Sequence, residues 1–216
     1  MKRQGFYIVG SLMLGLFLIL AVLVKLNYTH GPIPGIDPGI QKFAAALQNQ
    51  AWLVSIATII AKFLGDAGGL IVGVLIIGGL YFGFKQRAAA IWLAINIFIA
   101  VVGNTLIKLI VGRIRPETYR LASFAHEPGN SFASGHSVFA TVLFLALLMI
   151  AWPYLKTSTQ RVLASGLTAG LILLTMFSRV LLGVHYPSDT IGGFILAVGV
   201  LMLTYPTFIR YQARLK

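Results

Sequence analysis

Long apolar runs separated by short polar breaks fill almost the whole chain. A helix of about 20 apolar residues crosses a hydrocarbon core of roughly 30 Å, and most of these runs reach that length. Glycine, proline and charged residues gather in the breaks, as they do in turns. The pattern predicts an all-α integral membrane bundle of six transmembrane helices, at residues 5–26, 68–84, 88–110, 136–152, 161–182 and 189–208.

The segment of about 40 residues between the first two spans has a different pattern. It opens with the loop sequence Gly31-Pro32-Ile33-Pro34-Gly35. Asp37 followed by Pro38 predicts a helix N-cap with proline at the first helical position. From Gln41 to about Phe63 apolar residues dominate and charges are few. We therefore expect an interfacial helical segment that lies on the membrane surface or dips into it.

The composition excludes a soluble globule. With 58% apolar and 10% charged residues among 216, the chain has too little polar surface to coat one. The spans leave no room for a second domain, so residues 1–216 are predicted to form a single membrane domain. Lys2 and Arg3 precede the first run, as in a secretory signal. However, the run is long and no small-x-small cleavage site follows it before Asn27, so we expect a retained anchor.

The net charge of +12 comes from 17 basic residues scattered in ones and twos between the apolar runs. This distribution favours the membrane bilayer with its anionic lipid as the partner over nucleic acid. The chain has no cysteine. Disulfides, iron–sulfur clusters and thiolate zinc sites are therefore excluded.

The charged residues also predict an orientation. With a cytoplasmic amino terminus, nine basic residues and no acid fall on the cytoplasmic side, and all five acids fall on the opposite side. The basic residues then split nine to eight, or nine to five when Lys108, Arg115 and Arg179 are set aside as site residues. The positive-inside rule supports this arrangement. We expect a multi-pass protein of the cytoplasmic (inner) membrane with its site on the extracytoplasmic side.

Three polar clusters between residues 108 and 189 interrupt the apolar pattern. The first is Lys108-x6-Arg115-Pro116. Seven residues are about two helical turns, so both cations would lie on nearly the same face, and Pro116 should end the helix. Basic residues at the end of a membrane helix often only extend to lipid headgroups, and that alternative stays open for this cluster taken alone.

The second cluster, Ser134-Gly135-His136, stands directly before the apolar run 138–151. Ser134 is a good N-cap, and a helix N-terminus binds phosphate through free N–H groups and the positive end of its dipole. Gly135 would let a phosphate approach the backbone closely. A plain serine cap beside an interfacial histidine is the alternative.

The third cluster is Ser178-Arg179-x5-His185-x3-Asp189, with Pro187 placed to begin the last helix. Asp189 follows His185 by four residues, so its carboxylate can accept a hydrogen bond from Nδ1–H of the imidazole. That bond would leave the lone pair of Nε2 free to attack. Ionisable groups are costly at membrane depth, so a set on one membrane face indicates function.

The chemistry that these residues suggest is phosphoryl transfer. His185 would attack phosphorus and form a phosphohistidine intermediate, while His136 would protonate the leaving oxygen and later help to activate water. The five acids are too few and too dispersed for a two-metal phosphatase, so we expect no metal and no other cofactor. Fixed cations and backbone amides would stabilise the phosphate, with side chains from Lys108, Arg115, Ser134 and Arg179 and the amides around Gly135.

With these motifs the chain resembles the type 2 phosphatidic acid phosphatase superfamily, the lipid phosphate phosphatases, which share their site with vanadium haloperoxidases. The family pattern is Lys-x6-Arg-Pro, Pro-Ser-Gly-His and Ser-Arg-x5-His-x3-Asp. Ala133 replaces the proline of the second motif, which removes no chemical group. The motif-bearing core spans about 108–189. The resemblance implies that His185 is the nucleophile, Asp189 its partner and His136 the general acid, with the phosphate bound by Lys108, Arg115, Ser134, Gly135 and Arg179.

The resemblance implies a membrane phosphatase whose substrate is a lipid phosphate, of the phosphatidylglycerophosphate or phosphatidic acid type. An undecaprenyl pyrophosphate phosphatase is the alternative within the family. A non-catalytic lipid-binding protein or an anion transporter is the alternative from another class, although an anion pathway should continue through the apolar inner halves of the spans. The region between Lys108 and Ser134 adds four polar residues that we interpret as ordinary solvated positions rather than headgroup contacts, namely Arg113, Arg120, His126 and Glu127.

Overall fold

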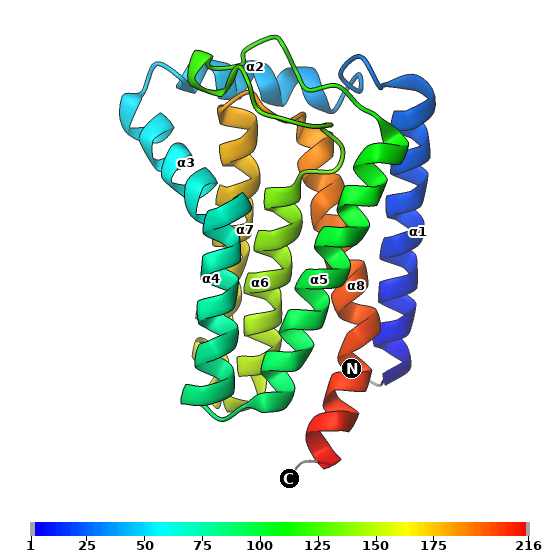
Figure 1. The fold of residues 1–216 in the computed structure, drawn as a ribbon, viewed down its shortest axis with the longest axis vertical. Helices are drawn as coiled ribbons and strands as arrows, with labels where there is room; N and C mark the ends of the chain where they lie inside the picture. The colour runs from blue at the N-terminus through cyan, green and yellow to red at the C-terminus, as the bar shows by residue number, and fades with distance from the viewer. Residues whose placement is uncertain (1–2, 215–216) are drawn as a thin grey trace.

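The computed structural model describes residues 3–214, which form a helical bundle without a β-strand. Each predicted span corresponds to a helix, with boundaries that differ by a few residues (Figure 1). These helices are α1 (Arg3–Asn27), α4 (Asp66–Gly78), α5 (Arg87–Val111), α6 (Gly135–Ala151), α7 (Ser158–Leu181) and α8 (Pro187–Arg214).

Five of these helices are long and apolar enough to cross a membrane. The exception is α4, which continues into the short π-helix η1 (Gly79–Gly83). Together they give an apolar helix over Ala67–Gly83, which is shorter than the other spans. A helix of that length covers roughly 25 Å, so α4 with η1 is a short candidate for the second span.

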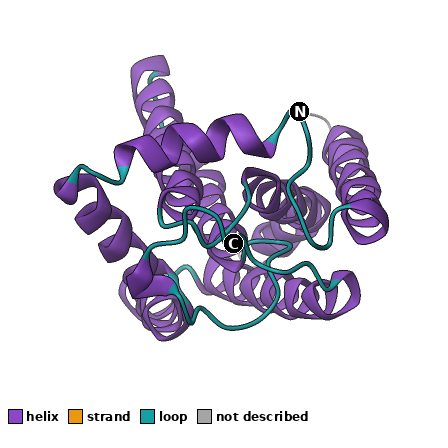
Figure 2. Ribbon diagram, turned by 90° about the horizontal axis from the view of Figure 1, so that it is seen from above, coloured by secondary structure: helices purple, strands orange, loops and turns teal. Residues whose placement is uncertain are grey.

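The segment between the first two spans is helical, as expected, and contains two helices. They are α2 (Asp37–Leu47) and α3 (Ala51–Leu64), and their axes differ by 116°. The helical prediction from Gln41 to about Phe63 was wrong only at residues 48–50, which form a turn. Seen from above, α2 lies across the ends of the other helices (Figure 2). An interfacial location for this helix remains a prediction.

The predicted N-cap at Asp37 was also wrong. Ile36 occupies the cap position and makes no side-chain cap bond, while Asp37 is already helical. The Asp37 carboxylate instead accepts hydrogen bonds from the backbone N–H groups of Ile33 and Ser188, at 2.7 Å and 2.8 Å. A fully buried carboxylate needs such donors, and a distant part of the chain supplies one of them.

The centre of the bundle is formed by α6 and α8, which are the most buried spans. They pack against each other, and α1 runs along α8. Phe17 of α1 stacks on Phe132, with ring centroids 5.8 Å apart. Phe132 is fully buried, so this contact fastens the long connection between α5 and α6 to the bundle. That connection carries Arg115 and Pro116 of the first cluster and Ser134 of the second.

At one end of the bundle α1 begins and α8 ends, and α2 and the connection 112–134 lie at the other (Figure 1). Because α5 ends, α6 begins and α7 meets α8 at this second end, all three motif clusters come together there. The prediction that they share one face is therefore confirmed. The side of the membrane that this face occupies remains a prediction.

Candidate active site

His185 lies in the tight connection between α7 and α8 and is 1% exposed. Its Nδ1 lies 3.4 Å from Oδ2 of Asp189, the pairing expected from the four-residue spacing. Gly183 makes this turn possible, because its φ of +72° is unfavourable for other residues. A side chain there would also collide with the carbonyl oxygen of Tyr119, 2.2 Å from an ideal Cβ.

Arg115 fixes the tautomer of His185. Its Nη1 lies 3.1 Å from Nε2 of His185. A guanidinium can only donate, so Nε2 accepts and the ring proton belongs on Nδ1, facing Asp189. Burial first, and then the positive charge of Arg115, hold the pKa of His185 well below its usual 6.5. The imidazole is therefore neutral at pH 7, with its lone pair on Nε2.

Backbone carbonyls hold the guanidinium of Arg115 in this position. Its nitrogens donate to the carbonyl oxygens of Pro128, Gly129 and Val184 at 2.8 to 3.1 Å. Burial lowers the pKa of Arg115 from its usual value to about 10, so the side chain remains charged at neutral pH. Lys108 is held in a similar way, because its Nζ donates to the carbonyl oxygen of Asn130 at 2.7 Å. Both cations line the same cavity.

The amino terminus of α6 borders the site. Ser134 is the N-cap, as predicted, and its hydroxyl accepts from the N–H of Ser137 at 3.5 Å. The Ser134 side chain is fully buried, whereas Gly135 lines the cavity. The backbone at Gly135 therefore borders the cavity, whereas the Ser134 side chain does not.

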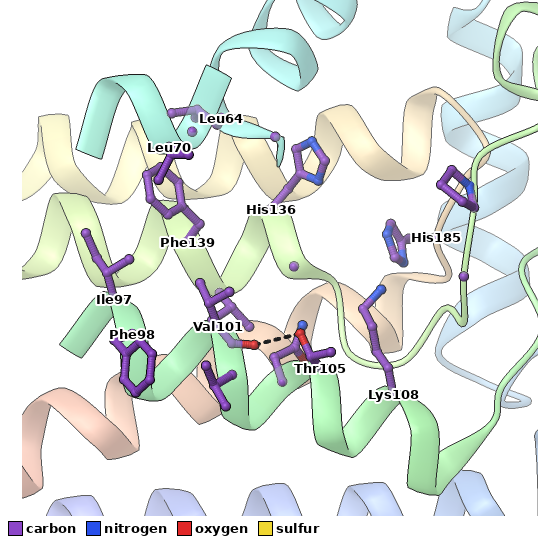
Figure 3. Close-up of a pocket in the computed structure, with 18 of the residues that line it drawn as sticks. Leu64, Leu70, Ile97, Phe98, Val101, Thr105, Lys108, His136, Phe139 and His185 are labelled. Carbon is purple, nitrogen blue, oxygen red and sulfur yellow. Dashed lines mark hydrogen bonds between the residues drawn. The ribbon is translucent and has the colours of Figure 1, made fainter. Parts of the chain in front are cut away.

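His136 faces the cavity from the first turn of α6 (Figure 3). Its Nε2 lies 3.0 Å from the carbonyl oxygen of Ala61 in α3. The carbonyl accepts, so Nε2 carries a proton and Nδ1 remains as the nitrogen that can exchange one. Gly65 permits this approach, because an ideal Cβ there would lie 2.4 Å from Nε2 of His136.

Arg179 is buried in α7 and forms an ion pair with Glu127 of the connection 112–134. Arg179 borders a second cavity of 260 Å³, together with Lys62 and His136. Glu127 and His136 border both cavities. Arg179 therefore belongs to the same cluster of cations, although it does not line the main cavity.

The main cavity has a volume of 630 Å³ and two chemically different ends. His136, His185 and Lys108 point into its polar end, and apolar side chains of α4, α5 and α6 extend away from them (Figure 3). Phe98 and Leu70 on this apolar flank are each 68% exposed. The flank is therefore open to the surroundings of the bundle between α4 and α5. Its shape suits an amphiphile with an anionic head.

Two residues interpreted as ordinary solvated positions form ion pairs instead. Arg113 is fully buried against Asp189, and Glu127 pairs with Arg179. His126 is exposed, as expected. The sequence analysis did not identify Ser131, whose hydroxyl donates to Oδ2 of Asp189. No motif includes this serine, so only the folded connection could reveal it. Within residues 3–214, no three His, Asp or Glu side chains are grouped closely enough to hold a metal ion.

Comparison with known proteins identifies the family of this chain. The family model described as PAP2 superfamily matches residues 89–212. Phosphatidylglycerophosphatase B of Bacillus subtilis is 31% identical over 183 residues, covering 84% of this chain and 86% of the relative. Undecaprenyl-diphosphatase of Sulfolobus acidocaldarius is 28% identical over 200 residues, covering 89% and 88%. The crystal structure of a transmembrane PAP2-type phosphatidylglycerolphosphate phosphatase from Bacillus subtilis superimposes with a TM-score of 0.70 at 25% identity, covering 93% of this chain and 96% of the other.

Proposed function

This chain belongs to the PAP2 superfamily and is a multi-pass membrane lipid phosphatase, and on that basis we propose that it dephosphorylates a glycerolipid phosphomonoester of the phosphatidylglycerophosphate type through a phosphohistidine on His185. The observation that carries the proposal is the two-ended cavity. Its polar end holds two histidines and two cations, and its apolar flank opens between α4 and α5. A lipid in the bilayer can present its phosphate to the histidines without leaving the membrane. We place the site on the extracytoplasmic side, following the charge distribution.

The first step is the attack of His185 on phosphorus. The phosphate takes the place of Nε2 as acceptor of the Arg115 N–H, which frees the lone pair of Nε2. A bond forms from Nε2 to phosphorus while the bond from phosphorus to the lipid oxygen breaks. Nδ1–H remains directed at Asp189, which stabilises the positive charge that develops on the ring. Lys108, Arg115, Arg179 and the amides around Gly135 offset charge on the phosphoryl oxygens.

His136 transfers a proton in each of the two steps of the reaction. His136 acts here as an imidazolium, a form that the negative charge of a bound phosphate favours. Its second proton, on Nδ1, passes to the departing lipid oxygen, while the Ala61 carbonyl continues to accept from Nε2–H. A water molecule then gives a proton back to Nδ1 and attacks the phosphohistidine, which releases inorganic phosphate. Displacement of the Glu127 carboxylate would make Arg179 accessible to the phosphate.

Arg115→Gln is expected to lower kcat/KM about 10²–10³-fold, the range typical for loss of one donor to a developing oxyanion. It should also move the acidic limb of the kcat/KM profile to higher pH. The reason is that a positive charge 3.1 Å from Nε2 disfavours the imidazolium form, so its removal raises the pKa of His185. Stopped assays with a short-chain lipid phosphate from pH 4 to 8 would measure both effects.

Arg115→Lys distinguishes the effect of the positive charge from that of the guanidinium geometry. This variant keeps the charge but lacks the planar group with several N–H donors. Its acidic limb should stay near that of the unchanged protein while its kcat/KM stays low. Arg161→Gln, at the opposite end of the bundle, serves as the charge-matched control. An unchanged acidic limb in Arg115→Gln would contradict the assigned electrostatic coupling.

Hydrolysis of a polyprenyl diphosphate is the second candidate, supported by similarity to the undecaprenyl-diphosphatase. A diphosphate would place a second charged phosphate beside Asn104 and Thr105, where the cavity becomes apolar. Desolvating that charge without a dedicated cation is costly. We therefore expect kcat/KM for phosphatidylglycerophosphate to exceed that for undecaprenyl pyrophosphate by about tenfold or more in matched detergent, a difference of about 1.4 kcal/mol. A clear preference for the diphosphate would reverse this assignment.

A further inference from the structure

Two buried charged residues, Arg113 and Asp37, have no part in the mechanism above. Neither side chain has measurable exposure. Nη1 of Arg113 lies 2.7 Å from Oδ1 of Asp189, and Nη2 lies 3.1 Å from Oδ2 of Asp37. The guanidinium also lies over the ring of Tyr186, 3.9 Å from its centroid. One buried cation thus bridges the carboxylate beside His185 and a carboxylate 152 positions earlier in the chain.

Asp37 holds the beginning of α8. The Ser188 N–H donates to Oδ1 of Asp37 at 2.8 Å, and the Ser188 hydroxyl donates to Oδ2 at the same distance. Nη1 of Arg113 donates to that hydroxyl as well. A free N–H in the first turn of a helix needs an acceptor, and here the acceptor comes from the first turn of α2. The turn that carries Asp189 is therefore fixed by a residue outside all three motifs.

Arg113 also determines which oxygen of Asp189 faces His185. Oδ1 is occupied by Nη1 of Arg113. Oδ2 is left to Nδ1 of His185, the Ser131 hydroxyl and the Tyr186 N–H. Rotation of the carboxylate would break the Arg113 bond, so the bond restrains rotation. The orientation of the imidazole depends in turn on Oδ2.

Stability alone is a weak explanation for this bridge. Buried ion pairs often contribute little net stability, because removing the charges from water costs as much as their attraction returns. The bridge is nevertheless fully enclosed and ends on the carboxylate that orients the proposed nucleophile. Its geometry bears directly on the direction of Nε2, where misplacement by about 1 Å can cost about 10²-fold in rate.

We propose that Arg113 and Asp37 are positioning residues for the reaction. Arg113 holds the Asp189 carboxylate in the orientation in which it accepts from Nδ1–H of His185. Asp37 holds both Arg113 and the first turn of α8 in place. This inference rests on the proposed role of His185 as nucleophile. Neither residue contacts the substrate, so their loss changes the chemical step and leaves phosphate binding in place.

The test uses Arg113→Gln, Asp37→Asn and the double variant Arg113→Gln/Asp37→Asn. The unchanged bridge has a net charge of −1, from two carboxylates and one guanidinium. The double variant keeps −1, whereas Arg113→Gln has −2 buried. We expect Arg113→Gln to lower the midpoint of thermal unfolding and the double variant to regain it. We expect kcat to be about 10²-fold below that of the unchanged protein in both Arg113→Gln and the double variant. The Ki for inorganic phosphate should remain within about threefold of its value in the unchanged protein.

A spectroscopic readout separates positioning from general structural support. The chain has four histidines, so ¹⁵N-histidine labelling gives a simple spectrum in which His185 is assigned from its alanine variant. The unchanged protein should show His185 with its proton on Nδ1 alone, and Arg113→Gln should show a mixture of tautomers. Arg113→Lys keeps a charge for Oδ1 of Asp189 and should recover part of kcat. If Arg113→Gln does not fold, Asp37→Asn and the double variant carry the same comparison.

Wild-type kcat in the double variant, or a single Nδ1–H tautomer in every variant, would overturn the positioning role. A rise in the phosphate Ki equal to the loss in kcat would assign Arg113 to phosphate binding instead. Failure of the underlying mechanism gives a different result, because His185→Ala would then retain turnover whatever the Arg113 variants show. Arg161→Gln again serves as the charge control, since it lies at the other end of the bundle.

Discussion

His185→Ala is expected to abolish phosphate release, with a loss of at least about 10⁴-fold in kcat, as for removal of the nucleophile in other enzymes with covalent intermediates. The reason is geometric. Nε2 of His185 is the ring nitrogen that faces Arg115 and the cavity, while Nδ1 is directed to Asp189. The fixed cations that remain can bind phosphate but have no lone pair to attack it. Phosphate release from phosphatidylglycerophosphate in detergent would measure the loss.

His126→Ala is the matched control, because His126 is exposed in the connection that covers the site. It should keep normal turnover. The Ki for inorganic phosphate should remain close to normal in His185→Ala, since Lys108 and Arg115 are still present. Substantial turnover by His185→Ala, with the protein folded, would remove this residue from the role of nucleophile.

Asp189→Asn is expected to lower kcat by about 10³–10⁴-fold, comparable to the effect of the same change behind a catalytic histidine elsewhere. An asparagine can turn its NH₂ group towards Nδ1 of His185, which stabilises the tautomer with the proton on Nε2. That tautomer has no lone pair on the attacking nitrogen. The variant also weakens the ion pair with Arg113, so activity should be compared at a temperature well below its unfolding midpoint.

Glu117→Gln provides the matched control for the loss of one carboxylate, because Glu117 is exposed in the same connection. A second measurement identifies the cause of the loss: ¹⁵N-histidine spectra should show the proton of His185 on Nε2 in Asp189→Asn. Normal kcat in a folded Asp189→Asn protein would exclude the carboxylate as the group that sets the tautomer.

The sequence alone predicted the geometry of the site where that geometry depends on residues close together in the chain. Asp189 follows His185 by four residues, so the pairing of Nδ1 with this carboxylate is local. The expectation that Lys108 and Arg115 lie two turns apart on one helix that Pro116 ends was wrong, because α5 ends at Val111 with Gly112 in the left-handed conformation. Arg115 therefore lines the cavity from the connection and not from α5. Ser134 as the cap of α6 follows from its position before an apolar run. The same locality explains why the six spans were predicted within a few residues.

The features that the sequence analysis missed depend on contacts between distant segments. Asp37 meets Ser188, and Ala61 meets His136, across pairs of helices whose packing no pattern of spacing describes. Asp37 followed by Pro38 matched the local signature of an N-cap. The Asp37 carboxylate is instead buried between Arg113 and α8, where it accepts hydrogen bonds from both. Arg113 looked like one more basic loop residue, because only the folded connection shows that it is buried. The turn at 48–50 also lacks glycine and proline, the usual signals.

The most direct test of the central claim is to trap the covalent intermediate. A lipid phosphate labelled with ³²P would be mixed with the protein in EDTA and quenched in alkali within milliseconds, and the labelled peptide would be identified by mass spectrometry. We predict a phosphoryl group on His185 that is stable to alkali and released by acid, and that is absent from His185→Ala. Full turnover with no label on the chain, or with the label on another residue, would contradict the mechanism.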